Sequence, residues 1–291
     1  MTTGVRRRTL TALIHGPAKV GKSTFGASTP PPRLILDVEL GSNFLPVNGY
    51  VMTNLRDPWP KQDGTWDTVI AEVMDWDDAD YLLDKLQKRE HPFKSVTLDS
   101  LAALQERLIF KVAGTGAPER QDWGEILRLL QNWCTQLRDM TRHPKYPLDA
   151  VCVLCPTVGK EIEGANGKTL THYGPHLRGQ LSTNSPYIFD ITGYLYTDHE
   201  RVPSSDGRSV TRVETRYLRT RRLPTVEAGE RVQGRVAEVI KLPQISGTPE
   251  EAVTKNTTFA KLIEHVYKSV NIAPPATSTV AVEPATSTEG K

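Results

Sequence analysis

HGPAKVGKST, residues 15–24, lies between the apolar run Leu10–Ile14 and a segment that can begin a helix. Within it, Gly16, Gly21, Lys22 and Ser23 match the pattern GxxxxGK[ST]. In that pattern backbone N–H groups wrap a phosphate, the lysine reaches the β- and γ-phosphates, and the hydroxyl binds Mg²⁺. A chance glycine turn is the alternative, but the preceding strand is an independent signal. We therefore predict a nucleotide-binding loop made of Gly16, Pro17, Ala18, Lys19, Val20, Gly21, Lys22, Ser23 and Thr24.

Two further apolar runs end in carboxylates. RLILD, residues 33–37, is followed by Val38 and Glu39, and SVTL, residues 95–98, is followed by Asp99. An α/β sheet binds ligands at the carboxyl ends of its parallel strands. We therefore predict that Asp99, with Ser23, is associated with Mg²⁺, and that Glu39 lies near the nucleotide. Solvated acids at strand ends are the alternative.

The remaining pattern predicts a chain of alternating strands and helices. We predict helices at 78–89, 101–112, 123–140 and 259–270, and strands at 150–155, 187–196 and, as a hairpin, 200–202 with 211–220. Residues 48–80 and 157–184 are predicted as irregular structure, the strand at 150–155 being ended by Pro156. The Pro-, Ala-, Ser- and Thr-rich residues 271–291 are predicted to be a disordered tail.

Composition indicates a soluble chain without a membrane partner. The 291 residues are 38% hydrophobic and 24% charged with a net charge of +2, and no apolar run is long enough to cross a bilayer. The N-terminus has no signal peptide pattern, so we expect a cytoplasmic protein. Cys152 and Cys155 have CxxC spacing, but they lie in a strand where residues three apart face opposite ways. We expect them to be buried rather than to bind metal.

Basic residues are concentrated in the second half of the chain. Residues 200–222 hold seven arginines against three acids, which favours a polyanion-binding face as much as a solvated strand. The glycine-rich residues 157–184 interleave basic groups with an aromatic ring, as in contacts that follow a nucleic-acid backbone. A solvated excursion is the alternative. The candidate DNA-binding residues are Lys160, Lys168, His172, Tyr173, His176 and Arg178.

The order of these motifs resembles the RecA-type ATPase core. SVTLDSLAAL at 95–104 resembles its Walker B strand, and LILDVE at 34–39 resembles the strand that ends in its catalytic glutamate. QDWGEI at 121–126, YGPHLRGQL at 173–181 and YIFDITGYL at 187–195 are similar to the phage-encoded RecA-like single-strand annealing ATPases. The resemblance covers about residues 9–224. It implies an α/β fold, namely a RecA-like P-loop NTPase core with a mainly parallel sheet flanked by helices, a C-terminal β-hairpin and the tail.

This resemblance also implies a function. It makes ATP and Mg²⁺ the cofactors, Glu39 the residue that orients the attacking water, and Lys22 a catalytic group. It places Arg219 and Arg221 at the nucleotide of a neighbouring subunit. The sequence indicates no nearby acid to neutralise them, and solvated arginines on an edge strand are the alternative. The expected partners are single-stranded DNA, further copies of the chain in a ring or filament, and a single-strand-binding protein. The family places a polar sensor at the end of the fourth strand, where this chain has Cys155, Pro156 and Thr157.

These implications give a domain division and leave other functions open. We expect an ATPase core at 1–240, an extension with a short helix at 241–270 and the tail at 271–291. The expected function is a DNA-stimulated ATPase of phage homologous recombination and repair that promotes single-strand annealing. A P-loop kinase for a small molecule and a non-catalytic, nucleotide-dependent loader or adaptor are the alternatives.

Overall fold

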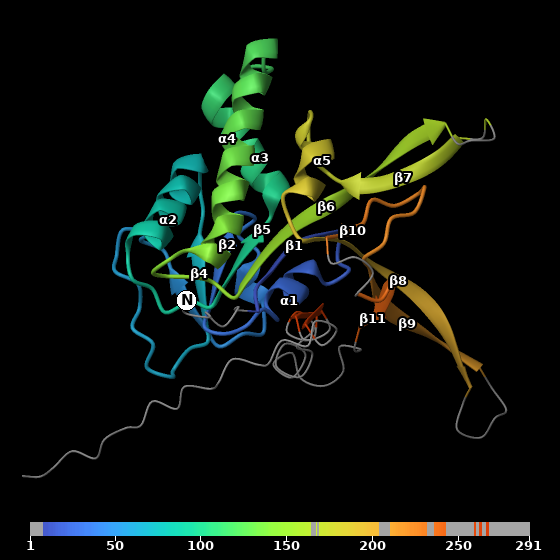
Figure 1. The fold of residues 1–291 in the computed structure, drawn as a ribbon, viewed down its shortest axis with the longest axis horizontal. Helices are drawn as coiled ribbons and strands as arrows, with labels where there is room; N and C mark the ends of the chain where they lie inside the picture. Colours follow the sequence, from blue (N-terminus) through green and yellow to red (C-terminus); the bar gives the residue numbers. More distant parts are fainter. Residues whose placement is uncertain are drawn as a thin grey trace, which may run out of the picture.

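The structure is a computed structural model, and it describes residues 8–163, 167, 169–203, 210–231, 236–242, 259, 262–263 and 266–267. Its helices and strands (Figure 1) are β1 (Leu10–Gly16), α1 (Lys22–Gly26), β2 (Arg33–Asp37), η1 (Ser42–Phe44), β3 (Gly49–Met52), β4 (Thr68–Glu72), α2 (Trp76–Lys88), β5 (Ser95–Asp99), α3 (Leu101–Ala113), α4 (Arg120–Asp139), η2 (Met140–Arg142), β6 (Ala150–Glu163), β7 (Thr169–Pro175), α5 (Leu181–Asn184), η3 (Ser185–Tyr187), β8 (Ile191–Pro203), β9 (Val210–Arg219), β10 (Gly229–Glu230) and β11 (Val239–Lys241).

One sheet runs through the molecule in the order β11-β9-β8-β1-β6-β5-β2-β4-β3. From β8 to β3 each of these neighbouring pairs is parallel, whereas β9 and β11 are added antiparallel. The register brings Asp37 opposite Asp99, and Gly16 opposite Pro156, so the strand ends lie along one edge. The predicted α/β class with a mainly parallel central sheet and flanking helices is confirmed.

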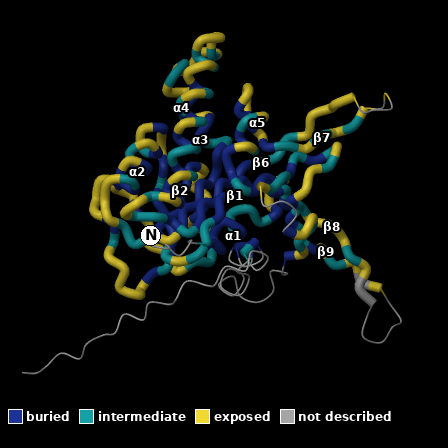
Figure 2. Tube along the Cα trace, in the orientation of Figure 1, coloured by how far each residue is buried: buried dark blue, intermediate teal, exposed yellow. Residues whose placement is uncertain are grey.

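The two faces of the sheet carry separate hydrophobic cores. Leu13 of β1 packs in the core formed with α2, α3 and α4, whereas Leu10, Ala12 and Ile14 pack with Phe25 of α1. This alternation follows from the two-residue period of a strand. Figure 1 shows α2, α3 and α4 together on one side of the sheet, and Figure 2 shows that the strands between the two layers are buried.

Local signals set the ends of the helices. Asp75 accepts a hydrogen bond from the backbone N–H of Asp78 at 2.9 Å and so caps α2. Ser100, directly after β5, caps α3 by accepting from Ala103 N at 3.4 Å. The predicted helices at 78–89, 101–112 and 123–140 are therefore present, with α2 and α4 beginning two and three residues earlier.

The two segments predicted to be irregular contain regular structure. Residues 48–80 include β3 and β4, and β4 is paired along its whole length with β2. Residues 157–184 are not a long loop, because β6 continues past Pro156 and pairs antiparallel with β7, with Thr157 opposite Pro175. Pro156 lies beyond the last residue of β6 that pairs with β5, which is Leu154 opposite Asp99. The missing backbone N–H of Pro156 therefore interrupts no hydrogen bond between β6 and β5.

The C-terminal half follows the prediction in part. The strand predicted at 187–196 begins at Ile191, after η3, and forms the expected hairpin with β9. Five described residues of the predicted terminal helix are helical, and Phe259, Leu262, Ile263 and Val266 are buried against the α1 face. The predicted tail at 271–291 lies outside the described residues, as does most of the predicted 241–270 extension.

The cysteines are buried, as predicted. Cys134, Cys152 and Cys155 are free thiols in the interior, and burial raises the pKa of Cys155 to about 12. No helix in the part of the chain that the structure describes is both long and apolar enough to cross a membrane.

Candidate nucleotide site

The predicted phosphate-binding loop joins β1 to α1. Gly16 is needed because a Cβ there would lie 2.3 Å from the backbone oxygen of Leu195, in the neighbouring strand β8. Gly21 has a positive φ of 92°, a conformation that side chains rarely adopt. Val20 is buried with Phe25 and so anchors the loop to the α1 core. Between these points Pro17, Ala18 and Lys19 are exposed, which leaves the loop open to a ligand.

Lys22 lies within this loop. Its Nζ donates to the backbone oxygen of Pro17 at 2.7 Å and to that of Gly16 at 3.2 Å. Burial lowers the pKa of Lys22, while Asp99 and Glu39 act in the opposite direction. The ammonium thus remains inside the loop, where a phosphate could replace the carbonyl oxygens as its partner.

The hydroxyl and carboxylate expected to serve Mg²⁺ are in contact. Ser23 Oγ donates to Asp99 Oδ2 at 2.5 Å, and burial raises the pKa of Asp99 to about 6. Hard oxygen donors of this kind suit Mg²⁺, which commonly takes one or two protein ligands and completes its shell with phosphates and water. The residues present therefore fit Mg²⁺ bound with a nucleotide.

Glu39 and Asp37 have different environments despite their spacing. Asp37 is 1% exposed, and its carboxylate accepts from the backbone N–H groups of Gly41 at 3.3 Å and Ser42 at 2.8 Å. Glu39 is exposed, and Ser100 Oγ donates to its Oε1 at 2.5 Å. Asp37 therefore organises the turn after β2, whereas Glu39 is available to a water molecule beside Asp99.

Arg219 and Arg221 are not isolated from acids. Arg219 Nη1 lies 2.8 Å from Glu238 Oε1, and Arg221 Nη1 lies 3.8 Å from Glu238 Oε2. The expectation that no acid neutralises them is therefore wrong, because the segment before β11 brings Glu238 beside the end of β9. Their proposed action on a neighbouring subunit stays a prediction.

Arg216, on the same strand, is the arginine that lies against the phosphate-binding loop. Its Nη1 is 2.7 Å from the position that a Cβ would take on Gly21. Arg216 was not among the residues predicted from the sequence. Residues three apart on a strand lie on opposite faces of the sheet, as Arg216 and Arg219 do. This spacing is the sequence signal that could have distinguished Arg216 from Arg219.

The six candidate DNA-binding residues divide among several places. Lys160 and His172 are opposite each other in the β6–β7 register and line one cavity, whereas Arg178 lines another beside α4. Tyr173 stacks with Tyr194 of β8 at 6.2 Å between ring centroids. His176 is exposed just after β7, and Lys168 lies outside the described residues.

Residues of α5 line both of these cavities. One, of about 220 Å³, includes Lys160, His172, Ser182, Tyr187 and Arg222 in its lining. The other, of about 310 Å³, includes Arg120, Trp123, Arg178 and Leu181. Six of these nine residues were not among the predicted DNA-binding residues, because they come from separate elements that only the fold brings together: Arg120, Trp123, Leu181, Ser182, Tyr187 and Arg222.

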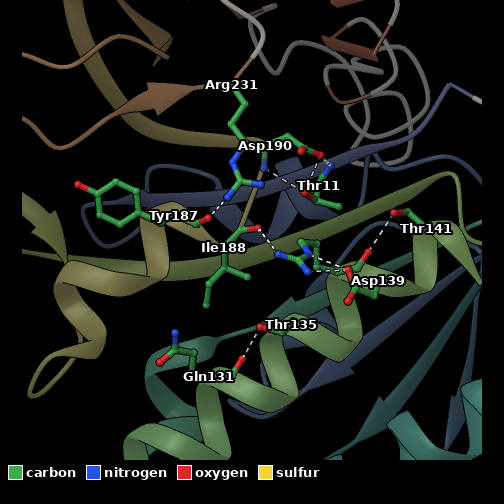
Figure 3. Close-up of polar contacts among 10 residues, drawn as sticks. Thr11, Gln131, Thr135, Asp139, Thr141, Tyr187, Ile188, Asp190 and Arg231 are labelled. Carbon is green, nitrogen blue, oxygen red and sulfur yellow. Dashed lines mark hydrogen bonds and ion pairs between the residues drawn. The ribbon is translucent and has the colours of Figure 1, made fainter.

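Tyr187 is an exposed aromatic on an anchored turn. Tyr187 is 71% exposed. Figure 3 shows the ring pointing away from the contacts that hold the turn, in which Arg231 donates to the Tyr187 oxygen and Arg138 donates to the Ile188 oxygen. Asp190 secures the end of the turn to β1, accepting from Thr11 N at 3.0 Å and from Thr11 Oγ1 at 2.7 Å.

The fold and the loop together define an α/β P-loop protein with a nucleotide site at the carboxyl ends of its strands. Residues 8–232 match the model of the family described as AAA domain, and the chain belongs to that family.

Other comparisons add distant similarities. None of the curated proteins matches the chain, whereas 102 chains of solved structures do. Flagellar accessory protein FlaH from Methanocaldococcus jannaschii is 9% identical with a TM-score of 0.35, over 84% of this chain and 88% of that chain. A second solved structure, which is described as an ATPase domain, is 14% identical with a TM-score of 0.35, over 72% of this chain and 82% of that chain. At these values neither similarity bears on function.

Proposed function

We propose that this protein hydrolyses ATP and binds single-stranded DNA, and that it promotes single-strand annealing in phage recombination. The hydrolytic part rests on one observation above all: the exposed Glu39 lies beside the Ser23–Asp99 pair and the loop lysine. Family membership supports nucleotide binding at this loop. The annealing role rests on the resemblance of residues 121–126, 173–181 and 187–195 to the phage proteins.

In the hydrolytic step, the chain's residues bind the nucleotide and orient water. Lys22 exchanges its loop carbonyl partners for the β- and γ-phosphates. Ser100 fixes one oxygen of the Glu39 carboxylate, so the other can accept a hydrogen bond from the water that attacks the γ-phosphorus. Mg²⁺, held by Ser23 with Asp99 nearby, would neutralise charge on the phosphates.

The DNA-binding part is supported by the two cavities beside α5. Each combines basic groups with an aromatic ring: Lys160 and Arg222 with Tyr187 in one, and Arg120 and Arg178 with Trp123 in the other. Single-stranded nucleic acid is bound by such combinations, because cations neutralise phosphates and rings stack on bases. Glu227, which pairs with Arg222 at 3.4 Å and with His172 at 3.5 Å, would have to release these groups to the phosphates.

A polar connection joins the nucleotide loop to the hairpin that lines the first cavity. His15, directly before Gly16, lies with Nδ1 3.1 Å from Thr157 Oγ1, and Thr157 Oγ1 donates to the Gly174 oxygen at 2.9 Å. Thr157 of β6 thus contacts the end of β1 directly, and Gly174 of β7 is linked to it through Thr157. They offer a route by which nucleotide and DNA binding could affect each other, at the position where the family's polar sensor is replaced.

The DNA site is tested by titrating a fluorescent oligothymidylate with the protein at several salt concentrations. Removing Lys160 and Arg222 together should weaken binding and reduce the slope of log K against log salt by about 1.4, the value expected for two phosphate contacts on a single strand. The matched control removes the exposed Lys61 and Lys145, which lie elsewhere, and so changes the net charge equally.

Stacking is tested separately at Tyr187. Tyr187→Ala should weaken oligothymidylate binding by about 1–3 kcal/mol, and Tyr187→Trp should restore it, because an indole ring can also stack on a base. If both the double charge variant and Tyr187→Ala bind as the parent does, the cavity beside β7 is not the DNA site.

A further inference from the structure

Arg216 extends from β9 to the outer side of the phosphate-binding loop. Its Nη1 lies 2.7 Å from the ideal Cβ position of Gly21, and its Cδ and Cζ lie 3.8 Å from the same point. An alanine at 21 would therefore meet the guanidinium as well as an unfavourable φ. The close approach brings a permanent positive charge to the backbone that wraps the phosphates.

The alternation of β9 assigns Arg216 to the face of the sheet that carries α1. Leu218, two residues further along β9, is buried in the core with Phe25 of α1, and residues two apart share a face. Arg219 points to the other face, where its ion pair with Glu238 is found. Of these two arginines, Arg216 is therefore the one directed to the chain's own P-loop.

The order of strands shows from which side Arg216 approaches. Asp99 and Glu39 follow β5 and β2, which lie on one side of β1, whereas β8 and β9 lie on the other. A triphosphate in the loop has its γ-phosphate at the carboxylates, where the magnesium and the attacking water belong. Its α-phosphate and nucleoside must then leave the loop away from that end, on the side reached by Arg216.

We propose that Arg216 binds the nucleotide in cis, by contacting the α-phosphate of the nucleotide held in its own P-loop. Guanidinium groups donate paired hydrogen bonds to phosphate oxygens. Arg216 is half-buried, so the attraction is screened less than at an exposed site. The proposal rests on nucleotide binding by the P-loop and is independent of the proposed DNA site.

The position of the contact predicts which measurements change. ADP and ATP both contain the α-phosphate, so Arg216→Ala should weaken both by the same factor, about 10- to 100-fold. Because the contact is made equally in the bound and transition states, the KM for ATP should rise by that factor and kcat should fall less than twofold. Arg216→Lys should lose less affinity than Arg216→Ala, because it keeps the charge and loses the paired geometry.

The experiment measures ADP and ATP affinity by calorimetry, with thermal unfolding to confirm that each variant is folded. Arg212→Ala is the matched control, because Arg212 is an exposed arginine four residues away on the same strand and face. Unchanged affinity in folded Arg216→Lys and Arg216→Ala would overturn the proposal. So would a loss confined to ATP, which would place the guanidinium at the γ-phosphate.

Mixing variants distinguishes a cis from a trans contact. Lys22→Ala and Arg216→Ala subunits should show no gain in ATP turnover at subsaturating ATP when combined, because no single P-loop then has both groups. A gain in mixed assemblies would overturn the cis assignment. If Lys22→Ala binds ATP as the parent does, nucleotide binding by the P-loop is itself rejected. If Lys22→Ala loses ATP affinity as expected and Arg216→Ala keeps the parent's affinity, only the role of Arg216 is rejected.

Discussion

Two acidic residues that the sequence places two apart have separate tasks in the structure. Asp37 is buried and accepts backbone hydrogen bonds from the following turn, whereas Glu39 is exposed next to Asp99. Residues two apart share one side of an extended strand, so their spacing in the sequence cannot distinguish the two. Leu40, with a positive φ of 56°, shows that the chain has already turned beyond Glu39. Burial and backbone bonding therefore select Glu39 as the candidate base.

Glu39→Gln should retain ATP binding and slow phosphate release by about 10²- to 10⁴-fold, because the amide cannot accept a proton and orients water less well. Lys22→Ala should instead lose binding, since it removes the charge inside the loop. Nucleotide affinity and steady-state turnover separate the two effects. Undiminished turnover in Glu39→Gln would show that another group orients the water.

His15 makes the stability of the protein depend on pH. Burial lowers the pKa of His15 from 6.5 to about 4, although the contact with the Glu227 oxygen acts in the opposite direction. The unfolded chain therefore binds more protons than the folded protein between these values, and the free energy of unfolding falls as pH falls from about 6.5 to 4. At 1.36 kcal/mol per unit, His15 accounts for up to about 3 kcal/mol of this loss.

Chemical denaturation at pH 7 and pH 4.5 measures this change. His91, whose pKa burial also lowers to about 4, adds a second contribution of the same sign. His15→Asn should reduce the difference in the free energy of unfolding between the two pH values. An unchanged difference would show that His15 does not titrate in this range.

At the scale of elements, the sequence predicted most strands around the nucleotide site, including parts of β6, β8 and β9, and missed β3, β4 and β7. β1, β2 and β5 are apolar runs followed by a glycine or an acid, and such runs are recognisable without periodicity. β4 was missed because TVIAE is short and mostly buried, so it lacks an alternating pattern. β7 does alternate, because Thr171 and Tyr173 are exposed and His172, which lies between them, is half-buried. Its neighbouring glycines, however, favoured the prediction of a loop.

The cysteines test the burial of two elements, α4 and β6. Cys134, Cys152 and Cys155 are each 0% exposed, and burial raises the pKa of Cys134 and Cys155 to about 12. Because the thiolate is the reactive form, all three should resist a maleimide in the native protein. Mass spectrometry should find no adduct before unfolding and three after it. Rapid modification of the native protein would contradict the placement of these side chains.

For the whole molecule, the sheet separates groups that adjoin in the sequence. Arg216 lies on the face of α1, whereas Arg219 lies on the opposite face and is paired with Glu238. An arginine that acts on a neighbouring subunit would have to exchange this acid for the neighbour's phosphate. In an assembly, Arg219 and Arg221 can therefore act on the neighbour's nucleotide only where its phosphates bind them more strongly than Glu238 does.

This proposed trans role predicts complementation. Lys22→Ala subunits and Arg219→Ala/Arg221→Ala subunits should each be inactive, and an equal mixture should recover about a quarter of parental turnover in a head-to-tail assembly, because one interface in four combines both intact groups. Co-purification of differently tagged subunits controls for assembly. Mixed assemblies without recovered activity would reject the trans role.

The most direct test of the proposed function is the rate of phosphate release from ATP with and without single-stranded DNA. A protein that couples the Glu39 site to the cavities beside α5 should hydrolyse ATP slowly alone and faster with DNA. The increase should be absent in Lys22→Ala and reduced in Lys160→Ala/Arg222→Ala. Phosphate release that is unaffected by single-stranded DNA over a range of concentrations would contradict the account.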